Sequence, residues 1–466
     1  MPDMPDNPLK PDEKPPWYRQ RNKIIAVIIL ALVALGAIAF VAWSQLKRPD
    51  DVSNPDVPFV VPDKKPKPKP KEHTVNWTTF RLNLQRTGYL PVKGIHPPFK
   101  RVWKYGDQPL LEFPPIVVDG RLYFVDNDGT AHALRSDNGR EIWSRKIASL
   151  NASTPTYSKG RLYIVNLEPG HVLSMNAKNG RIIWEKPLPC RSESSPAVVH
   201  DRVYFGCENG VLYALKARSG KEVWETSVEG AIKGAPAYED GTLFVGDYGG
   251  VVSAVRASTG EIKWQSDSLG GSFGRAGSFY STPAVAYGRV YLGSNDGRVY
   301  SFDKNTGEVA WTYSTGDWVY SGPSVAQVPG TPPTVYIGSF DGNVYALNAK
   351  SGEPRWTFPM GGQVIGSLSV IGRIVYAATF DGTTTYGIGA RSGRKVFEFH
   401  TGAYMPGVSD GEKLYLVGYS SIHALKPITL KELRAERRAR AALKAARIKA
   451  RRQAAKAKAR TGQSGQ

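Results

Sequence analysis

Few side chains of this protein belong to the types that act as nucleophiles, redox groups or metal ligands. Its 466 residues include only two cysteines, Cys190 and Cys207, and seven histidines. The histidines are scattered, and we find neither a metal-ligand spacing nor a Ser-His-Asp arrangement. Asp128, Asp296 and Asp341 lie in predicted turns, where aspartate is common because it bonds to the local backbone. We therefore expect no catalytic residue, no metal site and no bound cofactor.

Aromatic and charged residues between repeated segments are better suited to binding. The longest such segment, Ser266 to Ser281, is rich in glycine. Exposed aromatic rings next to arginine, held on the loops of a rigid scaffold, are typical of protein or peptide recognition. The candidate binding residues are Glu112, Arg191, Lys233, Arg275, Phe279, Tyr280, Trp318, Tyr320 and Tyr404.

Two series of aromatic residues indicate which elements position these loops. A tryptophan recurs every 40 to 47 residues, with a phenylalanine in the last place, and a tyrosine or phenylalanine recurs alongside it. The first series is Trp103, Trp143, Trp184, Trp224, Trp264, Trp311, Trp356 and Phe397, and the second is Tyr123, Tyr163, Tyr204, Phe244, Tyr291, Tyr336, Tyr376 and Tyr415. A period of about 40–45 residues with several strands per unit is typical of a propeller blade.

The repeated unit predicts four strands joined by tight turns. In one copy, Asn209-Gly210 and Ser219-Gly220 supply turns that need positive φ. The second strand is apolar on both faces, so each sheet is expected to pack between two neighbours. Second strands occur near residues 122, 162, 203, 243, 290, 335, 374 and 414. The predicted fold class is all-β, an eight-bladed propeller of four-stranded antiparallel blades.

The ring is predicted to close with a strand from before the first unit. The last unit, residues 413–427, ends before any tryptophan strand, whereas residues 100–105 are a tryptophan strand with no unit before them. We expect residues 100–105 to complete the last blade, because closure removes free sheet edges.

Alternating strand direction brings certain loops to one face of the propeller. The loop that enters a first strand and the turn after a second strand share that face, so Cys190 and Cys207 lie on the same face of one blade. In an oxidising compartment they could form a structural disulfide, and the alternative is two buried free thiols. The candidate binding residues gather on this face as well. The alternative there is that their rings simply fill the mouth of the central channel.

The repeat resembles that of the pyrroloquinoline quinone (PQQ) dehydrogenase-like propellers. The pattern GxxYALxAxSGxxxW runs from Gly210 to Trp224 and from Gly342 to Trp356, and the resemblance covers about residues 76–428. This family contains calcium- and PQQ-dependent alcohol dehydrogenases, non-enzymatic assembly scaffolds and sensor domains of membrane kinases. The resemblance implies the propeller fold, whereas function is open because one fold hosts many activities.

Within that family the chain is most similar to the outer-membrane-protein assembly scaffold (BamB-like) branch. Its blades are short, whereas the dehydrogenases carry long insertions around the cofactor. Cys190 and Cys207 are not adjacent, so the vicinal disulfide that the dehydrogenases would imply is absent. The chain also departs from the scaffold lipoprotein, because no cysteine near residues 24–46 could be lipidated.

Residues 24–46 carry no charge and are long enough to span a bilayer as a helix. A cleaved signal peptide is the alternative, since Ala37-Ile38-Ala39 resembles a cleavage site, but the apolar stretch is long for that role. Basic residues are more numerous before the span than directly after it, which favours a cytoplasmic N-terminus and an extracytoplasmic propeller.

The remaining segments account for most of the net charge of +20. Five lysines lie within residues 64–71, and residues 430–460 carry 13 Lys or Arg against two Glu. The predicted parts are a disordered cytoplasmic segment (1–23), a transmembrane helix (24–46), a Pro/Lys-rich extended linker (47–73), the propeller (74–428) and a basic, partly helical tail (429–466). The tail is expected either to contact an anionic lipid or envelope polymer, or only to aid solubility. Its expected location outside the cytoplasm argues against nucleic acid.

These observations favour a non-catalytic, membrane-anchored scaffold of the cell envelope with a protein partner. The alternatives are a PQQ-dependent quinoprotein dehydrogenase and an extracytoplasmic sensor domain.

Overall fold

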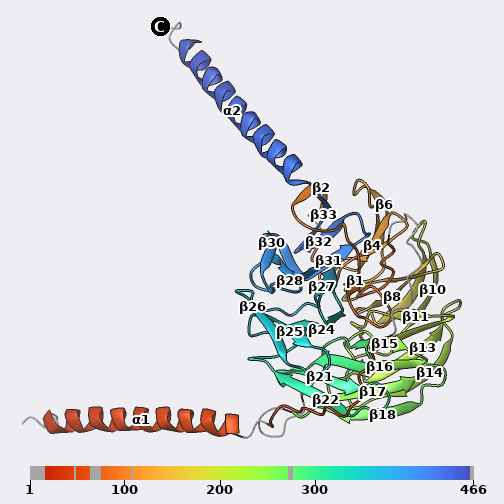
Figure 1. Cartoon of the computed structure of the whole chain (residues 1–466), viewed down its shortest axis with the longest axis vertical. Coiled ribbons are helices and arrows are strands. Elements are labelled where there is room, and N and C mark those ends of the chain that lie inside the picture. The colour runs from red at the N-terminus through yellow and green to blue at the C-terminus, as the bar shows by residue number, and fades with distance from the viewer. Residues whose placement is uncertain (1–15, 47–48, 63–74, 107–108, 271–276, 462–466) are drawn as a thin grey trace, which may run out of the picture. The chain divides into compact units, whose positions relative to one another are not determined.

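The computed structural model describes residues 16–46, 49–62, 75–106, 109–270 and 277–461. Within these ranges the strands form eight separate sheets arranged as the blades of a propeller (Figure 1). Seven sheets have four strands and one has five, and nearly all neighbouring strands are antiparallel. The predicted eight-bladed fold is confirmed.

Blades 1 to 6 each use four consecutive strands, from a short inner strand to an outer strand. Blade 1 contains β3 (Ile116–Val118), β4 (Arg121–Val125), β5 (Thr130–Arg135) and β6 (Glu141–Lys146). Blade 2 contains β7 (Thr156–Ser158), β8 (Arg161–Asn166), β9 (His171–Asn176) and β10 (Ile182–Pro187). Blade 3 contains β11 (Ala197–Val199), β12 (Arg202–Gly206), β13 (Val211–Lys216) and β14 (Glu222–Ser227).

The next three blades follow the same order. Blade 4 contains β15 (Ala237–Glu239), β16 (Thr242–Gly246), β17 (Val251–Arg256) and β18 (Ile262–Asp267). Blade 5 contains β19 (Ala284–Ala286), β20 (Arg289–Gly293), β21 (Arg298–Asp303) and β22 (Val309–Ser314). Blade 6 contains β23 (Ser324–Ala326), β24 (Thr334–Gly338), β25 (Asn343–Asn348) and β26 (Pro354–Pro359).

The last two blades each take a strand from before the first unit. Blade 7 contains β27 (Ser369–Ile371), β28 (Ile374–Ala378), β29 (Thr385–Gly389) and β30 (Lys395–Phe399), with β1 (Tyr89–Leu90) paired parallel to β27 as a fifth strand. Blade 8 contains β31 (Gly402–Ser409), β32 (Leu414–Gly418) and β33 (Ser421–Pro427), with β2 (Phe99–Gly106) as its outer strand.

Ring closure follows the prediction from the unmatched tryptophan strand. β2 pairs antiparallel with β33, from Phe99 opposite Pro427 to Gly106 opposite Ser421. In Figure 1 the orange β2 lies beside the blue β33, so the two ends of the repeat region share one sheet. With β2 in place, blade 8 has four strands like blades 1 to 6, and the edge of β33 is covered.

The second strand of each blade is buried because it is packed on both faces. In β4, Leu122 and Phe124 belong to the core shared with blade 8, whereas Tyr123 and Val125 belong to the core shared with blade 2. Alternate side chains of a strand point to opposite faces, so an all-apolar strand supplies two blade interfaces at once.

The repeated tryptophan joins each blade to the next one. The indole N–H of Trp143 in β6 donates to the carbonyl of Ala177 in blade 2 at 3.1 Å, and Trp184 donates to Ala217 in blade 3 at 2.9 Å. Gly180 lies directly under the Trp143 ring at φ 69°, where a Cβ atom would come within 2.7 Å of the indole. The turn of each repeat therefore needs glycine because the tryptophan ring of the preceding blade packs against it.

Residues 75–90, which we call the plug, close one end of the central channel. Main-chain hydrogen bonds join the plug to seven blades, and the Arg86 guanidinium reaches the eighth, blade 3, by donating to the Pro196 carbonyl at 3.1 Å. The bonded pairs are Val75 with Asp410, Trp77 with Val117, Thr78 with Tyr157, Leu84 with Tyr238, Gln85 with Val285, Thr87 with Val325 and Gly88 with Val370. The plug therefore contacts every blade.

Two arginines of the plug are buried without a carboxylate partner among the described residues. Arg81 donates to the carbonyls of Arg86 and Gly322, and Arg86 donates to those of Pro236 and Phe80. Burial lowers the pKa of each guanidinium to about 9. Each remains charged at neutral pH, and backbone carbonyls satisfy its donors.

Part of the predicted linker contacts the propeller instead of acting as a spacer. Asn54 N bonds to the Ala310 carbonyl, and Arg289 of β20 donates to the Pro58 carbonyl at 2.6 Å. Val57 is buried, and Phe59 stacks on Tyr287. Residues 51–60 are therefore held on blade 5, whereas the lysine-rich part, residues 64–71, lies outside the described residues.

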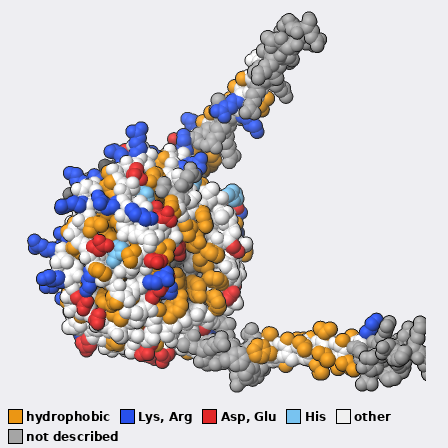
Figure 2. Space-filling view, turned by 180° about the vertical axis from the view of Figure 1, so that it is seen from behind, with side chains coloured by type: hydrophobic (Ala, Val, Ile, Leu, Met, Phe, Trp, Pro, Cys, Tyr) orange, Lys and Arg blue, Asp and Glu red, His pale blue; other side chains and the backbone are white. Residues whose placement is uncertain are grey.

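Two helices flank the propeller in sequence. α1 (Pro16–Leu46) includes Lys23–Val41, a 19-residue stretch of mean hydropathy 3.2 that is long and apolar enough to cross a membrane. A signal sequence has the same properties. The described side chains of α1 are almost all hydrophobic (orange in Figure 2).

The second helix, α2 (Leu430–Thr461), forms the basic tail. It begins with reciprocal bonds between Thr429 and Glu432, in which Thr429 Oγ1 accepts from Glu432 N at 3.2 Å and Glu432 Oε2 accepts from Thr429 N at 2.7 Å. This capping box gives the helix a defined start. The tail, predicted to be partly helical, is helical up to Thr461.

Candidate binding site at the channel mouth

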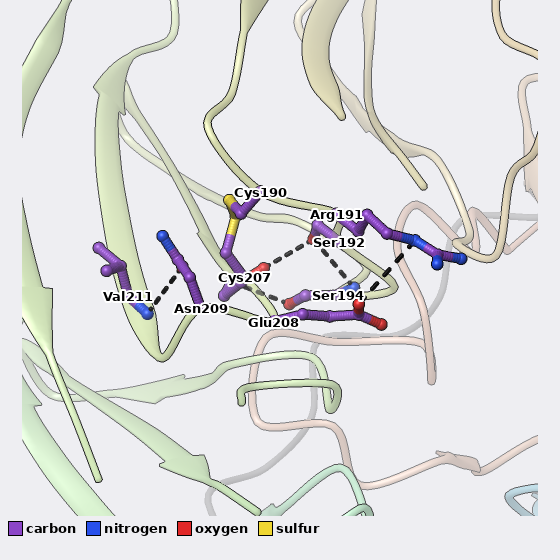
Figure 3. Close-up of a disulfide and its surroundings, with 9 residues drawn as sticks. Cys190, Arg191, Ser192, Ser194, Cys207, Glu208, Asn209 and Val211 are labelled. Atoms are coloured by element: carbon purple, nitrogen blue, oxygen red, sulfur yellow. Dashed lines mark hydrogen bonds and ion pairs between the residues drawn. A yellow bond between two sulfur atoms is a disulfide. The ribbon is translucent and has the colours of Figure 1, made fainter. Parts of the chain in front are cut away.

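Loops from different parts of each blade meet at one end of the channel. The alternation of strand direction within a blade, which we call strand parity, predicts this. Cys190, in the loop between β10 and β11, is joined by a disulfide to Cys207, which follows β12, with the Cα atoms 6.0 Å apart (Figure 3). Ser192 Oγ donates to the Gly206 carbonyl at 2.6 Å, and Ser194 Oγ accepts from Gly206 N at 3.1 Å. The loop is therefore fastened to the end of β12 by covalent and polar contacts.

The channel mouth holds a cavity of about 270 Å³ above the plug. Phe80 of the plug is among its lining residues, so the cavity is closed at its inner end. Its lining residues are Phe80, Glu112, Phe113, Glu193, Ser195, Lys233, Gly234, Ala235, Tyr280, Thr282, Tyr320, Phe340, Ile365, Gly366, Ser367, Phe380, Tyr404 and Met405.

One side of the mouth carries three glutamates and a lysine, which we call the acidic cluster: Glu112, Glu193, Glu208 and Lys233. Lys233 Nζ lies 2.5 Å from Glu193 Oε1 and 2.6 Å from Glu208 Oε1. Burial opposes the charge on Lys233, but the bonds to Glu193 and Glu208 outweigh it and raise the lysine pKa. Lys233 is therefore a cation held between two carboxylates.

Glu112 is the carboxylate of this cluster that Lys233 does not bind. It has no hydrogen bond or ion pair with any described residue, although it lines the cavity. Burial, with a smaller effect of the Glu193 charge, raises the pKa of Glu112 to about 7. A carboxyl group at this pKa changes its charge near neutral pH.

The other side of the mouth carries eight aromatic rings from blades 4 to 8, which we call the aromatic arc. One run of rings has centroids 6.1 Å apart for Tyr248 and Tyr280, 5.0 Å for Tyr280 and Tyr320, and 5.0 Å for Tyr320 and Phe340. Trp318 stacks on Tyr320 at 5.7 Å. A second run joins Phe380 to Tyr404 at 5.2 Å and Tyr404 to Tyr419 at 6.3 Å.

Tyr280 links the two sides of the mouth. Its hydroxyl donates to Glu193 Oε2 at 3.0 Å, while its ring packs in the aromatic arc. Burial, followed by the nearby carboxylates, raises the pKa of Tyr280 well above its usual value. The phenol therefore stays a neutral hydrogen-bond donor at physiological pH.

The structure brings together most of the residues predicted for this face. Five of them line the cavity: Glu112, Lys233, Tyr280, Tyr320 and Tyr404. Trp318 lies in the same arc and is 48% exposed. Arg191 lies outside the cavity lining, with its Nε 3.9 Å from Glu208 Oε2 (Figure 3). Arg275 lies outside the described residues.

The placement of Phe279 on the binding face was wrong. Its side chain is fully buried in the core between blades 4 and 5, with its ring centroid 5.4 Å from that of Tyr300. The adjacent residue, Tyr280, does face the cavity. Consecutive side chains of an extended segment point in opposite directions, so only one of the two neighbouring rings can reach the mouth.

Phe340 and Phe380 belong to the site but were not predicted. Each stands two residues before a turn glycine, and Glu208 and Tyr248 occupy the same place in blades 3 and 4. This position follows the second strand and reaches the mouth face, so aligning the repeats by their turn glycines could have identified it.

The predicted turn role of the aspartates holds where the structure shows their bonds. Asp296 Oδ1 accepts from Arg298 N at 3.0 Å, and Asp341 Oδ1 accepts from Asn343 N at 2.9 Å. Across the described residues, no group of three or more His, Cys, Asp or Glu side chains is placed to hold a metal ion.

Comparisons with solved structures show the fold. BamB from Moraxella catarrhalis is 19% identical, with a TM-score of 0.58 over 71% of this chain and 98% of that one. A quinohemoprotein alcohol dehydrogenase from Pseudomonas putida is 16% identical, with a TM-score of 0.64 over 80% of this chain and 83% of that one. A europium-containing methanol dehydrogenase is 12% identical, with a TM-score of 0.64 over 76% of this chain and 98% of that one.

The sequence itself identifies the family. No curated protein sequence matches the chain. Residues 92–235 and 208–426 match the profile of the family described as outer membrane protein assembly factor BamB, a range that includes every strand of blades 1 to 6 and most of blades 7 and 8. The chain therefore belongs to the BamB family of PQQ-type repeat propellers.

Proposed function

We propose that this protein is a non-catalytic scaffold, anchored in a membrane by α1, that binds a protein partner at the channel mouth outside the cytoplasm. The observation that carries the proposal is the aromatic arc. Its rings come from five blades, and Trp318, Phe380 and Tyr419 are 48%, 42% and 56% exposed. Binding energy in protein interfaces is concentrated in tryptophan, tyrosine and arginine on preorganised surfaces.

The rigidity of the surroundings supports binding at this place. The arc is held by short turns of the blades, and the plug fills the channel beneath it. A rigid site loses little conformational entropy when a partner binds. The alternative role, rings that only fill the channel mouth, fits Tyr280, but it does not explain why Trp318 and Tyr419 project into solvent.

The anchor is proposed from the length and hydropathy of α1. Arg19, Arg21 and Lys23 precede its apolar stretch, whereas Lys47 and Arg48 follow it. With Lys10 and Lys14 further upstream, the positive charge is larger on the N-terminal side, which favours a cytoplasmic N-terminus. The basic α2 is proposed to contact anionic lipid or an envelope polymer, and nucleic acid is not expected outside the cytoplasm.

The quinoprotein alternative can be tested against the lining of the cavity. PQQ is an anion that carries several carboxylates, so its site needs cationic side chains. Lys233 is the one cation among the described lining residues, and it is already bound to Glu193 and Glu208. Glu112 and Glu193 would repel the cofactor. The lining does not fit PQQ, which supports a scaffold over a dehydrogenase.

The proposal is tested by changing the exposed rings. Trp318→Ala with Tyr320→Ala should weaken the capture of crosslinked partners from intact cells by tenfold or more, because hot-spot rings contribute about 2 kcal/mol or more each. Thermal stability should stay close to that of the parent. Capture equal to the parent's would contradict the proposal. As a separate check on the alternative, purified protein titrated with PQQ and calcium should retain no quinone absorbance.

A further inference from the structure

The two sides of the cavity differ in chemistry, and that difference defines what it can bind. One side presents carboxylates of the acidic cluster, and the other presents the faces and edges of aromatic rings. An anion meets Glu112 and Glu193, and a purely apolar group leaves a half-buried carboxylate without a partner, which is unfavourable. A cation attached to an apolar stem satisfies both sides, because aromatic faces attract cations and carboxylates pair with them.

We propose that the cavity binds the side chain of a lysine or arginine presented by the partner polypeptide, with Glu112 as its ion-pair partner and the aromatic arc around its stem. This inference rests on the proposed function, since the partner docks at the same mouth. Glu112 carries the argument because it lines the cavity without a hydrogen bond or ion pair to any described residue.

Lys233 has a positioning role in this arrangement. It is bonded to Glu193 at 2.5 Å and Glu208 at 2.6 Å, and its ammonium also lies 5.8 Å from the centroid of the Tyr248 ring. It therefore neutralises part of the cluster and leaves a net negative charge beside Glu112. The structure already contains one ammonium between carboxylates and an aromatic ring, which is the environment proposed for the incoming side chain.

The size of the cavity agrees with a single side chain. Its volume of about 270 Å³ lies just below the roughly 300–1,000 Å³ usual for small-molecule sites. The plug closes its inner end, so a guest enters from the loop face and cannot pass through. The buried guanidiniums of Arg81 and Arg86 do not create an anion site, because they donate to backbone carbonyls of the plug and blades.

The test uses three capped tripeptides and ligand-observed NMR on the purified full chain. Ala-Lys-Ala should bind, whereas Ala-norleucine-Ala, which keeps the stem without the charge, and Ala-Glu-Ala should bind at least tenfold more weakly. Glu112→Gln should weaken Ala-Lys-Ala binding about tenfold. Glu353→Gln, which removes the same charge from an exposed outer turn, should leave the binding unchanged.

The pH dependence provides a second readout. The charged and titratable groups that act on or respond to Glu112 are Glu193, Lys233, Tyr280 and Tyr404. Both tyrosines stay neutral, and Lys233 stays charged. Deprotonation of Glu112 near pH 7 should therefore tighten Ala-Lys-Ala binding as pH rises from 6 to 8, and Glu112→Gln should flatten that rise.

The outcomes separate this inference from the proposed function. Equal binding of the lysine and norleucine peptides, or unchanged binding by Glu112→Gln with an unaltered melting profile, would overturn the inference. Partner capture that depends on Trp318 and Tyr320 but not on Glu112 would overturn it as well, while leaving the scaffold proposal intact. Loss of lysine binding in Glu112→Gln together with weaker partner capture supports both.

Discussion

The contacts between the outer strands of neighbouring blades repeat around the ring, whereas the loops at the channel mouth vary from blade to blade. Between the blades, seven tryptophans repeat one interaction, in which each indole N–H donates to a carbonyl of the next blade at 2.9–3.1 Å. At the mouth no single residue type occupies the equivalent positions around the ring, which carry Glu208, Tyr248, Phe340 and Phe380. Repetition marks the contacts that hold the ring together, and variation marks the surface that can recognise a partner.

Among the described residues, the contact between blades 7 and 8 is the one outer contact without a tryptophan. Phe397 takes the tryptophan place in blade 7 and faces blade 8, whose third and fourth strands, β33 and β2, come from different ends of the chain. No short turn joins these strands, so blade 8 lacks the turn whose carbonyl accepts the indole bond in the other blades. Phe399 stacks beside Phe397, which packs edge-on against Phe99 at 5.2 Å. This contact is apolar and needs no N–H donor.

The largest effect is expected from opening the ring. Removing residues 99–106 takes away β2, the Trp103 contact with blade 1 and the cover on β33. We expect Tm to fall by more than about 10 °C, because each kcal/mol lost shifts Tm by a few degrees in a domain of this size. Differential scanning calorimetry of the deletion and the parent measures this. A deletion that melts like the parent would show that closure by β2 is not needed.

Removing one buried tryptophan should have the next largest effect. Trp311 is 1% exposed and packs against Tyr291 at 5.9 Å. Trp311→Ala leaves a cavity between blades 5 and 6, and we expect a loss of about 3–5 kcal/mol in the free energy of unfolding. Chemical denaturation checks the value, with Trp318→Ala as the control because that tryptophan is half exposed.

Glu112 should impose a pH-dependent cost at the mouth. Its pKa is raised to about 7 in the folded protein, mainly by burial, so the folded state holds a proton that the unfolded state has already lost. Its contribution to stability therefore falls as pH rises from about 4.5 to 7 and stays unfavourable above that. At pH 8, Glu112→Gln should be more stable than the parent by roughly 1–3 kcal/mol, and at pH 4 the two should be nearly equal. A difference independent of pH would contradict this account.

A smaller change isolates the hydrogen bond of an outer contact. Trp224→Phe keeps a ring between blades 3 and 4 but removes the N–H that donates to the Ala257 carbonyl at 3.1 Å. We expect a loss of about 1–2 kcal/mol, since the bond and some ring area are lost together. Phe397→Trp is the matched reverse change, and it should give no gain because blade 8 lacks the turn that carries the acceptor in the other blades. A gain there would mean that the donor alone stabilises a junction.

The regular part of the fold could be predicted from the sequence, and its irregular parts could not. The spacing from Trp103 to Phe397 predicts the blades, and the unmatched strand at residues 100–105 predicts ring closure. The plug was missed because its bonds go to eight different blades, so residues 75–90 carry no period of their own. The contact of residues 51–60 with blade 5 was missed as well. It occurs at one blade only, so it also produces no repeat in the sequence.

The candidate site was predictable to the extent that strand parity decides which loops meet. Parity places Lys233, Tyr320 and Tyr404 at one end of the channel, and it brings Cys190 to Cys207. It does not decide which of two neighbouring rings points inward, so Phe279 was misplaced beside Tyr280. Nor does it show that Glu112 is left without a partner, because that depends on where Lys233 finds its two carboxylates.

The most direct test of the account compares stability and capture in the same variants. Trp318→Ala with Tyr320→Ala should change the free energy of unfolding by less than about 1 kcal/mol, because these rings lie at the exposed mouth, while partner capture falls by tenfold or more. Trp224→Phe should lower stability and leave capture unchanged when both are measured well below Tm. If the mouth variant destabilises the propeller as much as Trp311→Ala does, or if it still captures its partner, the separation between holding the ring and binding a partner is wrong.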